Sequence, residues 1–305
     1  MLYAAVQHAP HLGTEPDSLA NEAAVKAMPG VHSVHRLPGA VAVAADSWFR
    51  ARKAVEALEV TWTQPASTGF GSVAADYSSG GLLAALKAEP GRGISAEQAG
   101  DVEAAFASAA KVVEAEYDAP YLAHAQLEPP STIARFNADG TLELWMPNQM
   151  PELFQLFASQ TAGIPQDKVI IHSPILGGFC GRHFTHGPGN PFPQAILLAK
   201  ATGKPVKVLW SREEEFKRDA LRPLSFSRFS AALDKNGKPI ASRVPRGRGA
   251  ARPLIRRGGG RPGGQLGGRG HRPKALCDPQ PLDGSGQVPP TGDHRLLAVG
   301  GALHE

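Results

Sequence analysis

The pattern of apolar and polar residues over positions 1–63 predicts a compact α/β unit. Apolar runs bounded by turn residues are typical of strands, whereas apolar residues at helical spacing are typical of amphipathic helices. Ser18 is expected to cap a helix that ends at Met28, and Asp46 is expected to cap a second helix. The apolar face of that second helix consists of Trp48, Ala51, Val55 and Leu58. Strands are predicted at residues 3–6, around Val34, at 40–45 and at 59–63.

A second α/β region is predicted over residues 101–242. Apolar alternation on both sides of residues 137–140, Asn-Ala-Asp-Gly, indicates a β-hairpin. Ser211 followed by Glu214 is typical of a capping box at the start of a helix. The predicted helices are 101–110, 151–163, 193–202 and one after Ser211, and the predicted strands are 112–117, 131–136, 141–145, 169–173, 206–210 and 224–232. Residues 64–100 contain Gly, Ser and one predicted helix at 77–89, and we interpret them as a linker.

Residues 243–305 differ in composition from the rest of the 305-residue chain. They contain 15 Gly and 8 Pro but no Phe, Trp or Tyr, so they can bury too little apolar surface to offset the entropy of ordering. Their 10 Arg and 1 Lys against 4 acidic residues give +7, which leaves −3 for residues 1–242 because the whole chain has +4. We predict a mildly acidic folded body and a basic, disordered tail.

The cysteine content and the first residues of the sequence indicate the cellular location to expect. Cys180 and Cys277 are too few for a disulfide framework, which makes a reducing, cytoplasmic location the default expectation. The first residues lack the basic and apolar parts of a secretory signal, although a periplasmic location stays open if a signal is missing from this sequence. No apolar run approaches the roughly 18 residues of a membrane-spanning helix, so no membrane span is predicted.

The most informative motif is the glycine-rich stretch from Ile175 to His183. Gly177, Gly178 and Gly181 fall within five positions, after a predicted strand and shortly before a predicted helix. Glycine permits a sharp turn and the close approach of another molecule, and a strand–turn–helix arrangement presents backbone N–H groups to an anion. Taken alone, the motif is equally consistent with a tight structural turn.

Further motifs accompany this glycine loop in a fixed order along the chain. They are residues 37–48, residues 121–129 (Tyr-Leu-Ala-His-Ala-Gln-Leu-Glu-Pro), residues 147–149 (Pro-Asn-Gln), residues 199–207 and residues 210–215. Together they resemble the large, molybdopterin-binding subunit of the xanthine dehydrogenase/aldehyde oxidase, or molybdenum hydroxylase, family, with most similarity to the isoquinoline 1-oxidoreductase β-subunit type. The resemblance covers roughly residues 1–240. It implies a hammerhead-like domain over residues 1–63 and the first part of a molybdopterin-binding domain over residues 101–242.

The resemblance also implies a cofactor, a reaction and a partner. The cofactor is molybdopterin with molybdenum, in bacteria usually the cytosine dinucleotide form. The reaction is hydroxylation of an aldehyde or an N-heterocycle with oxygen from water, and a small subunit with 2Fe–2S clusters takes up the electrons. Gly177, Gly178, Phe179 and Gly181 are expected to contact the cofactor through their backbone, and Gln149 is expected to donate a hydrogen bond to a ligand of the metal. Cys180, in the same loop, is also expected to be a cofactor-binding residue, and it stands where the family usually has Phe.

Two departures from the family pattern limit what the resemblance implies. Arg182, His183 and Phe184 stand where purine-oxidising members have a Glu, which disfavours a xanthine-like substrate. The family's catalytic Glu belongs to a C-terminal region of a longer subunit, and the sequence after residue 242 does not look like family sequence. We therefore assign no catalytic residue and no metal ligand. Our hypothesis is a truncated, frameshifted gene product, with an inactive remnant of such a subunit as the alternative to an enzyme.

Other candidate sites have simpler structural interpretations. Cys180, His183 and His186 could suggest zinc, but an irregular loop does not enforce their convergence. His124 and Glu128 could suggest an acid/base pair, but four positions of extended chain separate them by about 13 Å, so we favour structural roles. The basic tail could contact nucleic acid, although it lacks aromatic residues on which bases stack. The charge run Arg212–Arg218 is interpreted as a solvated helix face.

Overall fold

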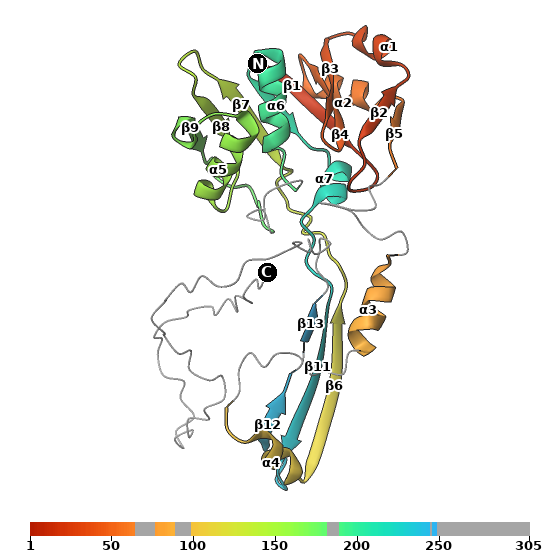
Figure 1. Ribbon diagram of the computed structural model, residues 1–305, viewed down its shortest axis with the longest axis vertical. Coiled ribbons are helices and arrows are strands. Elements are labelled where there is room, and N and C mark those ends of the chain that lie inside the picture. Colours follow the sequence, from red (N-terminus) through yellow and green to blue (C-terminus); the bar gives the residue numbers. More distant parts are fainter. Residues whose placement is uncertain (65–76, 89–98, 182–188, 245, 249–305) are drawn as a thin grey trace, which may run out of the picture. The chain divides into compact units, whose positions relative to one another are not determined.

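The computed structural model describes residues 1–64, 77–88, 99–181, 189–244 and 246–248 (Figure 1). These residues form helices and mixed sheets, so the predicted α/β (α+β) class is confirmed. The strands are β1 Leu2–His8, β2 Pro16–Leu19, β3 Val31–Leu37, β4 Ala40–Ala45, β5 Val60–Trp62, β6 Lys111–Ala119, β7 Ser131–Phe136, β8 Leu142–Trp145, β9 Val169–His172, β10 Val206–Leu209, β11 Ser225–Leu233, β12 Pro239–Arg243 and β13 Arg246–Arg248. The helices are α1 Glu22–Lys26, α2 Trp48–Glu56, α3 Ser79–Ala88, α4 Val102–Ala107, α5 Pro151–Ala162, the 3₁₀ helix η1 Gln166–Lys168, α6 Phe192–Thr202 and α7 Arg212–Arg218. None of the helices in the described ranges is long and apolar enough to cross a membrane.

The largest sheet has seven strands in the order β3-β4-β1-β10-β7-β8-β9. Strand β1 pairs antiparallel with β4 on one side and parallel with β10 on the other, where Leu2 lies opposite Val206. The predicted hairpin is present as β7 and β8, joined by the turn at residues 137–140. Strands from residues 1–63 and from residues 131–209 thus share one sheet. The domain boundaries at residues 63 and 101 stay a prediction, and β1 is the strand that joins the two regions.

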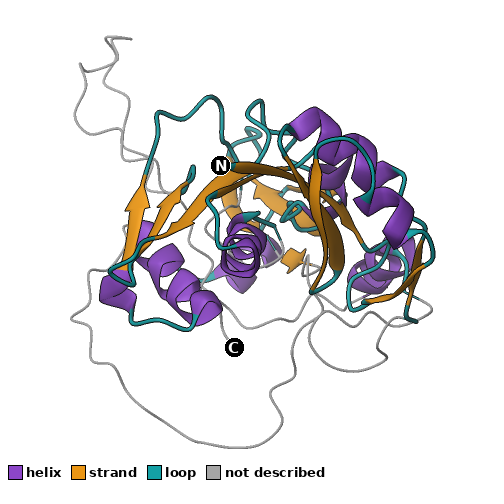
Figure 2. Ribbon diagram, turned by 90° about the horizontal axis from the view of Figure 1, so that it is seen from above, coloured by secondary structure: helices purple, strands orange, loops and turns teal. Residues whose placement is uncertain are grey.

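Alternate residues of β1 and β4 face two different cores. Ala4 and Val6 belong to a cluster with apolar side chains of α5 and α6, whereas Ala5 belongs to a cluster with side chains of α2. Figure 2 shows helices on both sides of the strands. All six residues of β4, Ala-Val-Ala-Val-Ala-Ala, are buried, as expected for a strand covered on both faces. Small side chains in β4 let helices approach closely from either side.

A second, four-stranded sheet is built around β11. One edge of β11 pairs with β6 over nine residues, and the other edge pairs with β12 and β13. Arg243 and residues 246–248, the start of the predicted disordered tail, therefore lie in strands. The Arg243 guanidinium contacts Glu103 at 2.5 Å and lies over the Phe106 ring of α4, which anchors the end of β12. The prediction for residues 249–305, and with it the nucleic-acid hypothesis, lies outside the described residues.

Two predicted helix starts are wrong. Ser18 lies in β2, because residues 16–19 pair with the distant strand β5, and α1 begins only at Glu22. The N-cap of α2 is Ser47 and not Asp46, since Ser47 Oγ accepts a hydrogen bond from the Arg50 N–H at 3.4 Å. Asp46 instead forms an ion pair with the Arg50 side chain.

The α2 cap supplies the first testable prediction. Replacing Ser47 with Ala is expected to lower the free energy of unfolding by about 1 kcal/mol, because a helix N–H loses its acceptor. Asp46→Ala is the matched control and should have a much smaller effect, since the Asp46 side chain is 51% exposed. Urea unfolding followed by circular dichroism measures both. A larger loss for Asp46→Ala would contradict the assignment of the cap.

Candidate functional site

The glycine loop follows β9 directly, as the sequence predicts. Gly178 has a φ of 94° and Gly181 a φ of 123°, a backbone region that side chains other than glycine rarely adopt. Phe179 is buried, with 4% of its surface exposed, and its ring anchors the loop to the body. The residues before it are solvent-exposed, including Ile175, Gly177 and Gly178. The loop therefore presents glycine backbone to solvent from a fixed base.

The segment of residues 121–129 supports one side of this loop. The Gly177 N–H donates a hydrogen bond to Glu128 Oε2 at 2.6 Å, and the Leu127 N–H donates to the Gly178 carbonyl at 3.2 Å. His124 points elsewhere, because its Nδ1 lies 3.2 Å from the Asp219 carboxylate. His124 and Glu128 thus have separate structural partners, in agreement with the structural interpretation of both residues.

Gln149 lies beside the loop although it precedes the loop residues by about thirty positions. Its Nε2 donates to the Phe179 carbonyl at 3.5 Å. The neighbouring Asn148 Nδ2 donates to Ser173 Oγ at 2.7 Å, which connects the end of β8 to the segment after β9. Parallel pairing of β8 with β9 explains this proximity, since both strands end at the same edge of the sheet.

The remaining loop residues bear on the metal hypothesis. Cys180 is exposed, and its Sγ lies 3.4 Å from the Gly178 carbonyl. His183 and His186 lie outside the described residues, so the suggested Cys180–His183–His186 site stays untested. Within the part of the chain that the structure describes, no three His, Cys, Asp or Glu side chains are grouped to hold a metal ion.

Helix α7 departs most from its predicted role. The charge run Arg212–Arg218 was expected to be solvated, yet Glu214, Glu215 and Arg218 are buried, with 8%, 2% and 8% of their surfaces exposed. Ser211 caps the helix by accepting a hydrogen bond from the Glu214 N–H, so that half of the predicted capping box is confirmed. The Glu214 side chain does not complete the box, because it reaches the end of β1. The solvated-face interpretation is therefore wrong, and buried partners explain why charges are tolerated there.

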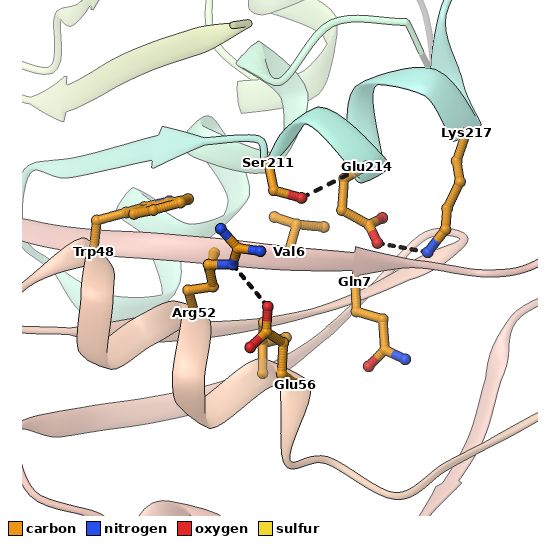
Figure 3. Close-up of a pocket in the computed structure, with 10 residues that line it drawn as sticks. Val6, Gln7, Trp48, Arg52, Glu56, Ser211, Glu214 and Lys217 are labelled. Atoms are coloured by element: carbon orange, nitrogen blue, oxygen red, sulfur yellow. Dashed lines mark hydrogen bonds and ion pairs between the residues drawn. The ribbon is translucent and has the colours of Figure 1, made fainter.

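Glu214 connects α7 to β1 across 206 positions of sequence. Its Oε2 accepts from the His8 backbone N–H at 2.7 Å and lies 2.8 Å from His8 Nδ1, while its Oε1 accepts from Lys217 at 2.6 Å. Figure 3 shows Glu214 and Lys217 on α7 above Val6 and Gln7, at a pocket of about 230 Å³. Burial tends to raise the pKa of Glu214, but the hydrogen bonds from His8 and Lys217 outweigh it and hold the pKa below its usual value.

The other ring nitrogen of His8 fixes the tautomer. The Trp210 indole Nε1 can only donate, and it donates to Gln194 Oε1 at 2.7 Å. Gln194 therefore directs its amide Nε2 toward His8 Nε2, 2.9 Å away, which must accept. His8 is thus neutral with its proton on Nδ1, facing Glu214. Burial lowers the pKa of His8, and the positive charges of Arg218 and Lys217 lower it further. The hydrogen bond with Glu214 and its negative charge raise the pKa but do not outweigh burial.

This arrangement predicts a pH dependence of stability. Because the His8 pKa is lower in the folded than in the unfolded chain, the unfolded chain binds more protons below about pH 6.5. The contribution of His8 is complete above that pH and decreases as the pH falls toward the folded-state pKa. Urea midpoints at pH 7.5 and 5.5 should differ less in His8→Gln than in the natural chain. An equal difference in both proteins would contradict the neutral tautomer.

The sequence model of the molybdopterin cofactor-binding domain matches residues 86–245, just over half of the chain. The matched range contains the supporting segment 121–129, Gln149 and the glycine loop. The chain belongs to the molybdenum hydroxylase family. The resemblance found in the sequence motifs is thereby confirmed, and the glycine loop, its supporting segment and Gln149 belong to the matched molybdopterin cofactor-binding domain.

Curated relatives of this molybdenum hydroxylase chain are much longer. It is 33% identical over 253 residues to isoquinoline 1-oxidoreductase subunit beta of Brevundimonas diminuta, covering 80% of this chain and 31% of that protein. It is 34% identical over 204 residues to the membrane-bound aldehyde dehydrogenase (pyrroloquinoline-quinone) of Gluconacetobacter polyoxogenes, covering 67% of this chain and 25% of that protein. The chain therefore spans less than a third of either relative.

The fold of this molybdenum hydroxylase chain is also similar to a solved structure. The aldehyde oxidoreductase from Desulfovibrio gigas matches with a TM-score of 0.61 at 19% identity, over 80% of this chain and 30% of that chain. At this identity the similarity concerns the fold. The matched part is 30% of the solved chain, so the fold described here corresponds to one part of that larger fold.

Proposed function

We propose that this chain supplies part of the cofactor site of a molybdenum-dependent hydroxylase. The reaction is hydroxylation of an aldehyde or an N-heterocycle with oxygen from water. The proposal rests on one observation: in a chain of this family, Gln149 and the glycine loop lie together, with Gln149 Nε2 3.5 Å from the Phe179 carbonyl. Neither Gln149 nor the loop would suffice alone, because a positioned donor and a close-approach surface are both needed for an anionic cofactor.

The described residues fit such a cofactor. Leu127 and Glu128 occupy one side of the loop, and Gly177 and Gly178 remain exposed without side chains to block a ligand. The Gly177 N–H donates to Glu128, so we assign Gly177 a role through close approach. We assign backbone contacts with the cofactor to Gly178, Phe179, Cys180 and Gly181.

The cofactor and partner complete the proposal. When bound, molybdopterin in its cytosine dinucleotide form supplies the redox chemistry, and a small subunit with 2Fe–2S clusters accepts the electrons. The Gln149 Nε2 donates one hydrogen to the Phe179 carbonyl, and its second amide hydrogen would be donated to a ligand of the metal. Phe179 holds the loop against the body by burying its ring. No residue of this chain is assigned as the general base.

The alternative function is that of a non-catalytic remnant of such a subunit. The observation in its favour is that the chain spans 31% and 25% of the lengths of its two relatives. If no further residues complete it, a cofactor pocket built from several regions of a subunit would be incomplete. In that case the chain keeps the family fold and has no hydroxylase activity.

Cofactor content distinguishes the two functions. The chain should be purified after co-expression with a small 2Fe–2S subunit and assayed for molybdenum, pterin and, because the name of one relative includes it, pyrroloquinoline quinone. Near-stoichiometric molybdenum and pterin are expected, and aldehydes and N-heterocycles would then be screened as substrates. A folded, soluble chain without molybdenum would contradict the proposed function and support the remnant.

A further inference from the structure

The Arg212 side chain at the start of α7 contacts the segment that supports the glycine loop. Its Nη1 donates to the Gln126 carbonyl at 2.5 Å, and its Nη2 lies 3.3 Å from the Leu127 carbonyl. The planar guanidinium presents two donors in a fixed fork, so it fixes the relative orientation of two successive peptide groups. A single ammonium group cannot impose the same geometry.

Those two peptide groups lead directly to the loop contacts. Leu127 uses its N–H to bind the Gly178 carbonyl, and Glu128 uses its carboxylate to bind the Gly177 N–H. Arg212, residues 126–128 and residues 177–178 therefore form one continuous series of hydrogen bonds. Arg212 contacts the supporting segment, so it acts on the loop through that segment.

The position of Arg212 is itself fixed. Arg212 forms an ion pair with Glu215, whose side chain is only 3% exposed, on the next turn of α7. Two further contacts hold the supporting segment. The His124 Nδ1 lies 3.2 Å from the Asp219 carboxylate, and the Arg222 N–H donates a hydrogen bond to the Leu122 carbonyl at 2.8 Å. Between these anchors Ala125 has a φ of 48°, a left-handed conformation that a non-glycine residue keeps only where its surroundings enforce it.

We propose that Arg212, held by Glu215, is a positioning residue that sets the geometry of the glycine loop through the carbonyls of Gln126 and Leu127. The consequence for cofactor binding rests on the proposed function. The effect of Arg212 on the geometry of the loop does not depend on it. The buried charges of α7 thus serve the loop as well as the link between α7 and β1.

Amide hydrogen exchange on the full chain tests the proposal. In Arg212→Ala, exchange at the hydrogen-bonded amides of Leu127 and Gly177 is expected to rise about tenfold. Arg212→Lys should restore part of the protection, because Lys keeps one donor. Glu213→Ala is the matched control on the same helix, with a side chain that is 67% exposed. Val55→Ala, a core substitution within α2, controls for a general loss of stability.

The exchange measurements test the role of Arg212 independently of the proposed function. Faster exchange at Leu127 and Gly177 in Arg212→Ala, absent from Glu213→Ala and Val55→Ala, supports it, and unchanged exchange overturns it. If Arg212→Ala gives no soluble protein, Glu215→Gln serves instead, with an expected rise of about threefold at the same amides. Molybdenum content of the natural chain tests the proposed function, and its absence would leave the exchange result interpretable.

Discussion

Replacing Glu214 with Ala is expected to lower the free energy of unfolding by about 3 kcal/mol. The carboxylate accepts both the backbone N–H and the Nδ1–H of His8, which is buried in the fold. Removing it leaves two buried donors without an acceptor, and each such donor costs about 1–3 kcal/mol. Lys217 loses its partner as well, but its side chain is 44% exposed and can turn to water.

Two further variants separate this explanation from a general sensitivity of α7. Glu214→Gln keeps an oxygen that can accept from His8, so its loss should be about 1 kcal/mol. Glu213→Ala, the exposed neighbour, loses only a surface ion pair with Arg52 and should lower the free energy of unfolding by less than about 1 kcal/mol. Equal losses for Glu214→Ala and Glu214→Gln would mean that charge, and not the capacity to accept from His8, determines the stability of this contact.

Replacing Gly178 with Ala is expected to displace the glycine loop and to lower the molybdenum content of the purified chain about tenfold or more. A Cβ at Gly178 would lie 2.9 Å from Leu127 Cβ, and the φ of 94° would strain any side chain. The strain and the overlap together cost about 3 kcal/mol. If the loop moves away from Leu127 to relieve that cost, it lengthens the hydrogen bond between the Gly178 carbonyl and the Leu127 N–H. Metal analysis, with urea unfolding in parallel, measures both effects.

Gly140 provides the matched control for that substitution. It has a φ of 81° in the turn between β7 and β8, but a Cβ there would meet no atom within 4 Å. Gly140→Ala should therefore carry similar backbone strain without disturbing the loop, and its molybdenum content should equal that of the natural chain. A parallel loss of molybdenum in both variants would show that reduced stability, and not the position of the loop, controls cofactor content.

Local patterns were sufficient to predict most of the elements of this fold. The turn at residues 137–140, the Ser211 cap and the left-handed Gly163 at the end of α5 all depend on a few neighbouring residues. Ser18 was misassigned because its strand exists only through pairing with β5, more than forty positions away. The buried charges of α7 were missed for the same reason, since the sequence Arg-Glu-Glu-Glu-Phe-Lys-Arg looks solvent-exposed until its distant partners are known.

The candidate site shows the same limit. The glycine loop and Gln149 were found through motifs that resemble a family, and the structure places them side by side. The roles of Glu128 and Arg212 were not found, because each depends on a backbone group of a segment distant in sequence. A signal was nevertheless present. Glu128 lies in the motif of residues 121–129, and Arg212 lies in the motif of residues 210–215. Both side chains can bind backbone groups, and this possibility could have been considered as well as exposure to solvent.

The pairing of β1 with β10 has a consequence for how the chain is made. Residues 2–4 are synthesised about 200 positions before their parallel partners, residues 206–208. At about 5–20 residues per second, the edge of β1 waits on the order of 10–40 s for β10 to be synthesised. An unpaired apolar strand edge can pair with other chains and begin aggregation. A chaperone that covers this edge of β1 until β10 has been synthesised would therefore prevent such pairing.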